Sequence, residues 1–307
     1  MPDPAALVTV AVAMLAGAMR VSTPFLFVSL GECLTEKSGR INLGNEGVLV
    51  LGAMVAYGTS YETGSPILGV LAAAFAGMLL GGVHGAVCAL ARVNDVAMGI
   101  AIMLAGTGIA FFFGKPYVQP TAPQLPAIPL GFWSDLPQVR SALNVGVLFF
   151  VGLIAAVLLH WVLRSTRAGL RVRIVGDSED AARALGLPVL RIRLFATAAG
   201  SALAGIGGAS LSLSYPGSWN EGLSSGQGLM AVALVVFARW NPLACIGAAL
   251  LFGAAGALGP SLQTIGVTWG YYLFYAAPYA LTLAILVATV VPGHSLRGMP
   301  GELSLGR

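Results

Sequence analysis

Charged side chains are scarce in this sequence. Of its 307 residues only 9% are Asp, Glu, Lys or Arg, whereas 57% are hydrophobic and the mean hydropathy is +0.86. A water-soluble domain has roughly a quarter of its residues charged. The shortage excludes a water-soluble fold, and the long apolar runs predict helices in a bilayer. We expect one membrane domain over residues 1–307, because no segment between the runs is long enough for a second domain.

Motifs for catalysis and for binding nucleotides or metals are also missing. The sequence has no GxxxxGK[ST] phosphate loop, no HExxH zinc motif and no GxSxG nucleophile elbow. Cys33, Cys88 and Cys245 form no CxxC pair and lie in or beside apolar runs, where small buried thiols are common. We therefore expect no enzyme activity, no cofactor and no metal in this chain.

Nine apolar runs predict transmembrane helices in an all-α polytopic fold. A span needs about 20 residues, and the runs cover residues 5–33, 42–58, 66–91, 95–113, 143–163, 194–215, 227–238, 243–260 and 271–291. The first run could be broken at residues 20–24, and the seventh is too short to cross alone. The prediction is therefore about nine crossings, within a range of eight to ten.

Basic residues indicate the orientation, because Lys and Arg collect on the cytoplasmic side of membrane proteins. With nine crossings, all but three of the 16 Lys and Arg residues fall on one side; the exceptions are Arg20, Lys115 and Arg140. The bias predicts a cytoplasmic C-terminus and loop 164–193, an external N-terminus and an external proline-rich loop 114–142. It also accounts for the net charge of +4 without a nucleic-acid partner.

Two similar segments hint at an internal duplication. Residues 39–47 (GRINLGNEG) and residues 217–228, which contain GSWNEG and GQG, each precede an apolar run. The predicted topology puts the first segment at the inner face and the second at the outer face, as in transporters built from inverted repeats with interrupted helices. The match is short, and chance or ordinary turn chemistry explains it equally well.

The loop at residues 164–193 carries a local helix signal. Ser178 can cap a helix that starts with Glu179 and Asp180, because short polar and acidic side chains stabilise a helix N-terminus. Small residues follow, and Gly186 with a proline two residues later ends the pattern. Two or three turns are marginal in water, so this helix must dock on something. The alternative is a plain solvated loop whose arginines serve only the topology.

Part of this loop resembles a known motif. Residues 180–186, DAARALG, are similar to the EAA loop of ABC importer permeases, with Asp180 where that family often has Glu. The Ile and Pro spacing of the longer motif is missing, which points to the branched-chain amino acid, ribose and nucleoside permeases. Residues 31–47 and 226–242 (GQGLMAVALVVFARWNP) resemble two signature stretches of the nucleoside-type members. Together the three stretches extend the resemblance from about residue 24 to residue 291.

The resemblance implies the permease subunit of an ATP-driven importer in the cell inner (plasma) membrane. In such a subunit the loop helix couples transport to the ATPase, which assigns that role to Glu179, Asp180, Ala181, Ala182 and Gly186. The implied partners are an ATPase that binds ATP and magnesium, a second, longer permease and an external solute-binding lipoprotein. The implied solute is a nucleoside or a purine-like compound. Ribose-like sugars, branched-chain amino acids and an ATPase-independent secondary transporter are the alternatives.

Polar residues at membrane depth are candidates for the solute path. Glu32 ends the first run, Asn42, Asn45 and Glu46 begin the second, and Asn220 lies in the later glycine-rich segment. A carboxylate at this depth costs a few kcal/mol on insertion scales, so it usually faces a cavity or a partner. Asn42, Asn45, Glu46 and Asn220 are predicted to line the path, with a structural role as the alternative for the first three. For Glu32 we favour a structural role, paired with backbone or with Arg40.

Overall fold

The computed structural model describes residues 4–90, 93–133, 140, 143–263, 274, 276–289 and 298–305. Within these residues the fold is mostly helical. Its helices are α1 (Pro4–Lys37), α2 (Asn45–Thr63), α3 (Pro66–Val87), α4 (Asp95–Gly114), α6 (Val147–Ser165), α7 (Arg167–Asp177), α8 (Glu179–Ala184), α9 (Val189–Leu213), α10 (Gln227–Phe237), α11 (Pro242–Gln263), α13 (Ala277–Thr289) and α14 (Gly301–Leu305). A 3-10 turn (Lys115–Tyr117) and two short strands, β1 (Ala127–Pro129) and β2 (Asn144–Gly146), lie between α4 and α6.

Six of the described helices are long and apolar enough to cross a membrane, namely α1, α3, α4, α6, α9 and α11. α10 has 11 residues and α13 has 13, so neither reaches the length of a full span. α2 has 19 residues but begins with Asn45 and Glu46, which lower its hydropathy. The all-α polytopic class is confirmed, whereas the count of nine crossings stays a prediction.

Most predicted helices agree with the observed ones to within a few residues, and the differences have local causes. The helix predicted to begin at residue 143 begins at Val147, because Val145 pairs with Ile128 in a two-stranded antiparallel ribbon. The helix predicted from residue 194 already begins at Val189, directly after a proline. Of the last predicted span, 271–291, residues 271–273, 275, 290 and 291 lie outside the described residues.

α1 is continuous through Pro24, so the break considered at residues 20–24 does not occur. A proline inside a helix removes one backbone hydrogen bond. In the turn before it, the hydroxyls of Ser22 and Thr23 both donate to the carbonyl of Met19 at 3.0 Å. The helix therefore continues through the proline, with side-chain hydrogen bonds added in the turn before it.

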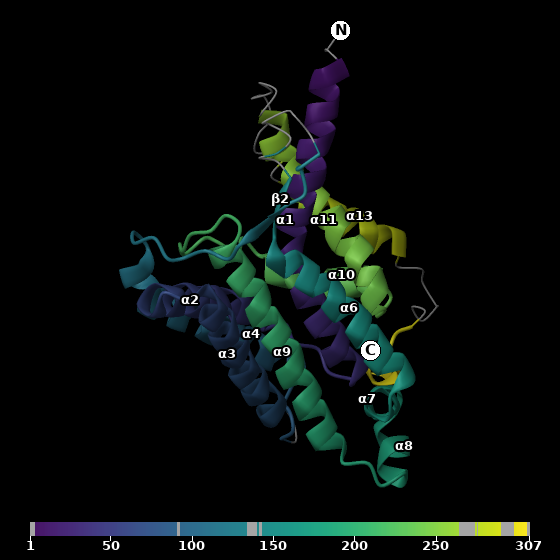
Figure 1. Cartoon of the computed structure of the whole chain (residues 1–307). Coiled ribbons are helices and arrows are strands. Elements are labelled where there is room, and N and C mark those ends of the chain that lie inside the picture. The colour runs from purple at the N-terminus through teal and green to yellow at the C-terminus, as the bar shows by residue number, and fades with distance from the viewer. Residues whose placement is uncertain are drawn as a thin grey trace.

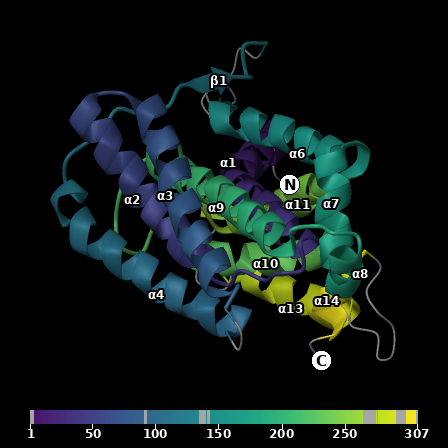
Figure 2. The same cartoon turned by 90° about the horizontal axis from the view of Figure 1, so that it is seen from below.

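α1 and α9 form the centre of the bundle. α9 packs against α1, α2 and α3, while α1 also packs against α10 and α11, and Figure 2 shows the other helices around this pair. In the most apolar windows, 67% of the residues of α1 and 61% of those of α9 are buried, against 22% for α3 and α4 and 28% for α6. The apolar side chains of α3, α4 and α6 thus face outward, as lipid-facing side chains do.

Glycines bring the two central helices into backbone contact. A Cβ atom on Gly31 of α1 would lie 2.1 Å from the carbonyl oxygen of Gly200 in α9, and one on Gly200 would lie 2.4 Å from the oxygen of Gly31. Any side chain at either position would overlap the facing backbone. This is the close approach that small residues permit between membrane helices.

The first turns of α1 and the corner between α7 and α8 lie at opposite ends of the molecule (Figure 1). α14 lies beside α7 and α8 at the second of these ends (Figure 2). Residues 164–193, predicted to hold one short helix, hold α7 and α8 together with the first turn of α9.

Candidate functional site

α8 has the start and the end that its sequence predicts. The Ser178 hydroxyl accepts the N–H of Ala181 at 3.2 Å, which caps the helix. At the other end Gly186 has φ = +71°, a conformation that favours glycine, and its N–H donates to the carbonyl of Arg183 at 2.9 Å. The helix predicted from Glu179 is therefore confirmed.

One face of α8 docks on its own chain. Ala182 is fully buried in a small apolar cluster with Val175 of α7 and Val189 of α9. The sequence predicts that a helix this short must dock on something, and for Ala182 the contact lies within the chain, on α7 and α9. The chain's own helices supply the docking surface that a helix of this length requires.

The opposite face of α8 and the turn after it are exposed. Asp180, Ala181 and Gly186 are on this surface, and Leu185 is 66% exposed. An open groove of about 550 Å³ follows at the turn into α9, with lining residues Arg183, Leu187, Pro188, Val189, Leu190 and Arg191. The exposed surface therefore combines apolar side chains with flanking arginines.

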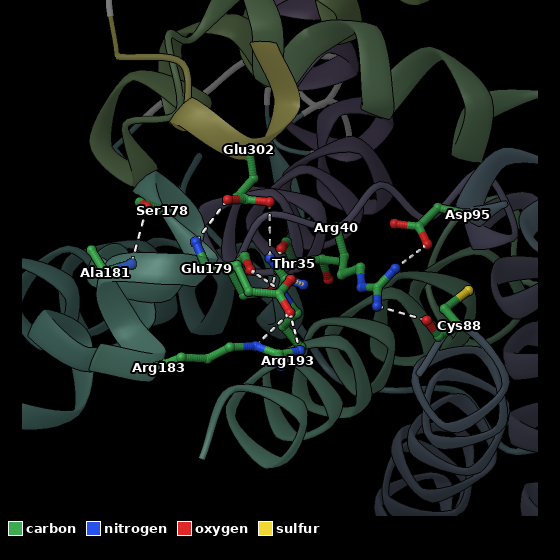
Figure 3. Close-up of polar contacts among 11 residues, drawn as sticks. Thr35, Arg40, Cys88, Asp95, Ser178, Glu179, Ala181, Arg183, Arg193 and Glu302 are labelled. Atoms are coloured by element: carbon green, nitrogen blue, oxygen red, sulfur yellow. Dashed lines mark hydrogen bonds and ion pairs between the residues drawn. The ribbon is translucent and has the colours of Figure 1, made fainter. Parts of the chain in front are cut away.

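The carboxylate of Glu179 is engaged inside the chain (Figure 3). Arg183 and Arg193 each donate to one of its oxygens at 2.5 Å. Burial alone would raise the pKa of Glu179, but the hydrogen bond from Arg183 and the charge of Arg193 outweigh it and leave the pKa below its ordinary value. Glu179 thus ties α8 to the start of α9 through Arg193.

A second arginine, Arg40, joins the α1–α2 connection to the α3–α4 connection at the same end of the molecule (Figure 3). Arg40, between α1 and α2, lies 2.6 Å from the carboxylate of Asp95 and donates to the carbonyl of Cys88 at 2.6 Å. Asp95 is the first residue of α4. Arg40 thus pairs with Asp95 and not with Glu32.

Glu32 pairs instead with backbone and amide groups in a buried network. Its two oxygens accept the N–H of Asn42 at 2.8 Å and the side-chain amide of Asn45 at 2.7 Å. The Asn42 amide also donates to the Ser201 hydroxyl of α9 at 3.1 Å. Asn42 and Asn45 are at most 1% exposed. These contacts join the start of α2 to α1 and α9, which is the structural role that the sequence left as the alternative.

Glu46 is used to hold the start of α10. Its carboxylate accepts the N–H of Gly228 at 2.7 Å, the N–H of Gly226 at 3.1 Å and the hydroxyl of Ser224 at 2.6 Å. The two similar segments therefore touch at their C-terminal ends. Their other ends lie apart: Gly39 lies near Glu302 of α14, whereas the Trp219 indole donates to the carbonyl of Gly114 at the end of α4.

A cavity of about 210 Å³ lies beside the start of α10. Its walls include Arg20, Phe25, Tyr215, Gln227, Met230 and Tyr279. The oxygen Oε1 of Gln227 is buried, and no hydrogen-bond partner for it lies among the described residues. Asn42, Asn45, Glu46 and Asn220 are not among the described residues that line this cavity. Asn220 is exposed in the preceding turn, where its side-chain oxygen accepts the N–H of Gly222 at 3.1 Å.

Comparison with known proteins identifies the family. Residues 14–291 match the model of the "Branched-chain amino acid transport system / permease component" family. The chain belongs to this family. It is 31% identical to TsgC13 of Haloferax volcanii, provisionally named as a glucose ABC transporter permease, over 94% of each chain.

Other relatives of this permease are named for nucleosides. It is 27% identical to the nucleoside ABC transporter permease NupC of Lactococcus lactis, over 86% of this chain and 88% of the relative. It is 29% identical to the guanosine ABC transporter permease NupQ of Bacillus subtilis, over 88% of this chain and 89% of the relative. The permease is an integral membrane, non-catalytic transport subunit, and ATP is hydrolysed by partner ATPases.

Proposed function

We propose that this permease moves a nucleoside or a purine-like solute into the cytoplasm. Two relatives, matched over 88% and 89% of their length, are named for nucleosides, and two stretches of this chain resemble nucleoside-type members. The agreement between these two findings carries the proposal. In the structure Glu46 joins the two stretches. Glucose, or another sugar, is the second candidate, because a relative at 31% identity is named for glucose. Branched-chain amino acids have only the family's description in their favour.

The arrangement of the two ends supports the predicted orientation. α7, α8 and α14 lie together at the end that carries the arginine-rich loop, and the first turns of α1 lie at the other end (Figure 1). We place the loop and the C-terminus in the cytoplasm and the N-terminus outside, with about nine crossings related by an inverted repeat. A second, longer permease, an ATPase with ATP and magnesium, and an external lipoprotein complete the transporter.

The docking surface for the ATPase is the exposed side of α8 and the turn after it. Asp180, Ala181, Leu185 and Gly186 are accessible there, whereas Glu179 and Ala182 support the helix from behind. A coupling helix needs an outward face that fits a groove on its partner. Side chains at helical spacing on that face act as the anchors. We propose Leu185 as the apolar anchor of this contact.

The solute path runs along the cavity beside the start of α10. The Gln227 oxygen, which has no partner among the described residues, and the tyrosines supply polar and aromatic contacts for a small ring-containing solute. At about 210 Å³ the cavity is below the usual lower end of about 300 Å³ for ligand pockets, which suits a path that a second permease completes. Asn42, Asn45 and Glu46 act on this path indirectly, by fixing the starts of α2 and α10, and Asn220 lies in the segment that leads to it.

Uptake by the whole transporter tests the solute. Proteoliposomes with the permeases, the ATPase and the solute receptor should accumulate labelled guanosine or adenosine only when ATP reaches the ATPase. An excess of unlabelled glucose should leave this uptake unchanged. Accumulation of glucose in place of nucleosides would support the second candidate, and nucleoside uptake without the ATPase would contradict the ATP-driven assignment.

Substitution of Leu185 tests the docking surface. Because hot-spot anchors contribute at least about 2 kcal/mol to binding, Leu185→Asp should lower ATPase co-purification by at least about tenfold. Leu170→Asp is the matched control, since Leu170 is 48% exposed on α7 in the same loop. Equal loss of the ATPase from both variants, or from neither, would contradict this assignment.

A further inference from the structure

The side chain of Arg193 joins four parts of the chain at the α8 end of the bundle. It is only 6% exposed and belongs to the second turn of α9. Its Nη1 donates to Glu179 of α8 at 2.5 Å, and its Nε donates to the carbonyl of Ser38, just after α1, at 3.1 Å. Its Nη2 lies 3.4 Å from a carboxylate oxygen of Glu302 in α14. One buried cation therefore links α9, α8, α14 and the end of α1 (Figure 3).

The C-terminal segment, residues 298–302, also contacts α8 and the end of α1. Glu302 accepts the backbone N–H of Glu179 at 2.7 Å, so it contacts the first turn of α8 directly. The ammonium of Lys37, the last residue of α1, donates to the carbonyl of Gly298 at 2.8 Å. A Cβ on Gly301 would lie 2.2 Å from the carbonyl of Asp177, which ends α7. Residues 298–302 thus lie tightly against α1, α7 and α8.

These contacts place α8 in direct connection with the α1–α2 turn. Ser38 begins that turn, and four residues later Asn42 enters the buried network with Glu32 and Ser201. Glu46 follows and holds the start of α10. A displacement of α8 has a short route through the side chain of Arg193 to the α1–α2 turn and the helices that follow it, in addition to the packing of Gly176 in α7 against Lys37.

We propose that Arg193, Glu179 and Glu302 form an ionic clamp that transmits movement of α8 to the α1–α2 turn. Arg193 and Glu302 are positioning residues in this scheme, because neither belongs to the proposed docking surface for the ATPase. The inference rests on the proposed function, since it assigns a role within ATP-driven transport. It adds a role for the C-terminal helix, which docking of α8 alone does not require.

The chemistry of the clamp suggests conservative variants. Removal of one partner from a buried ion pair leaves the other charge uncompensated, so a truncation to Ala would confuse folding with coupling. Glu302→Gln keeps an oxygen for the N–H of Glu179 and removes only the charge. Arg193→Lys keeps the charge but loses the planar fork that reaches several acceptors at once.

Uptake per ATP hydrolysed by the reconstituted transporter measures the coupling. For both variants we expect about a tenfold fall in this ratio, within the usual range for coupled sites, with the ATPase co-purifying at the wild-type level. Glu62→Gln is the matched control, because Glu62 lies at the far end of α2 and should leave the ratio unchanged. An unchanged ratio in both clamp variants, or loss of the ATPase comparable to that in Leu185→Asp, would overturn the proposal.

Hydrogen exchange of the purified permease separates the clamp from the proposed function. In Arg193→Lys the amides of α8 and of residues 38–44 should exchange faster together, while those of α2 beyond its first turns stay protected. Faster exchange confined to α14 would overturn the clamp even if transport were active. If α8 and residues 38–44 exchange faster together but the transporter shows no ATP-driven uptake, the clamp is supported and the proposed function is rejected.

Discussion

Two short helices of this chain start on a carboxylate that belongs to a distant segment. Glu302 accepts the N–H of Glu179 at the start of α8, and Glu46 accepts the N–H groups of Gly226 and Gly228 at the start of α10. The first four N–H groups of a helix lack partners within the helix, and its N-terminus is electropositive. At the start of α8 and of α10, a carboxylate both accepts these N–H groups and places a negative charge at the positive end of the helix.

The surroundings of the two carboxylates differ. At α8 the acids are balanced by Arg183 and Arg193, and the Glu302 side chain is 21% exposed. Glu46 is 9% exposed, and its hydrogen-bond partners are two backbone N–H groups and one hydroxyl, all neutral. Solvent and salt can screen the first arrangement but hardly the second. The difference suits a movable element at α8 and a fixed one at α10.

Loss of the buried carboxylate should have the largest effect. Glu46→Ala leaves three donors without an acceptor, and each buried unsatisfied group costs about 1–3 kcal/mol, so we expect a loss of about 3–9 kcal/mol in stability. Thermal unfolding of the purified permease in detergent measures it. Glu46→Gln, which keeps one oxygen acceptor, should lose clearly less; equal destabilisation by the two variants would argue against hydrogen bonding as the cause.

Removal of the side-chain cap at α8 should have a moderate and local effect. Ser178→Ala should destabilise the first turn of α8 by about 1 kcal/mol, which corresponds to roughly fivefold faster hydrogen exchange of its amides. Thr166 caps α7 in the same way, with its hydroxyl accepting the N–H of Gly169 at 3.1 Å. Thr166→Ala is therefore the control, and it should speed exchange in α7 and not in α8.

Loss of the Glu179 charge at low pH should have the smallest effect. Because the pKa of folded Glu179 is lowered, its ion pairs contribute stability above the unfolded pKa of about 4.3, and that contribution disappears as pH falls through the folded value. The unfolding midpoint of the wild type should therefore fall more steeply below about pH 4.5 than that of Glu179→Gln. Identical pH profiles would show that the carboxylate carries no net stabilisation.

Local signals in the sequence predicted much of this fold. Apolar runs located the long helices because burial in lipid demands continuous hydrophobicity. The limits of α8 followed from Ser178 and Gly186, which act on their own neighbours. α7 was missed because its arginines suggest a loop. Its helix is held by tertiary packing, in which Gly176 touches the backbone of Lys37 at the end of α1.

Long-range partners could not be predicted in the same way. Glu46 and Gly228 are 182 residues apart, and nothing in either segment specifies the other. α14 has five residues, too few for propensity to indicate a helix, and it is placed by the contacts of Glu302. The choice between a solute-lining and a structural role for Asn42 and Asn45 likewise needed the position of Ser201.

The backbone contact between Gly31 and Gly200 restricts how the bundle can rearrange. At this contact the backbones of α1 and α9 touch directly, and no side chains lie between them that could adjust if one helix slid along the other. Packed elements of this kind move as rigid bodies, and motion concentrates at segments outside them. A change of access in this permease would therefore move α1 and α9 together as one rigid body, with the movable α8 outside this pair.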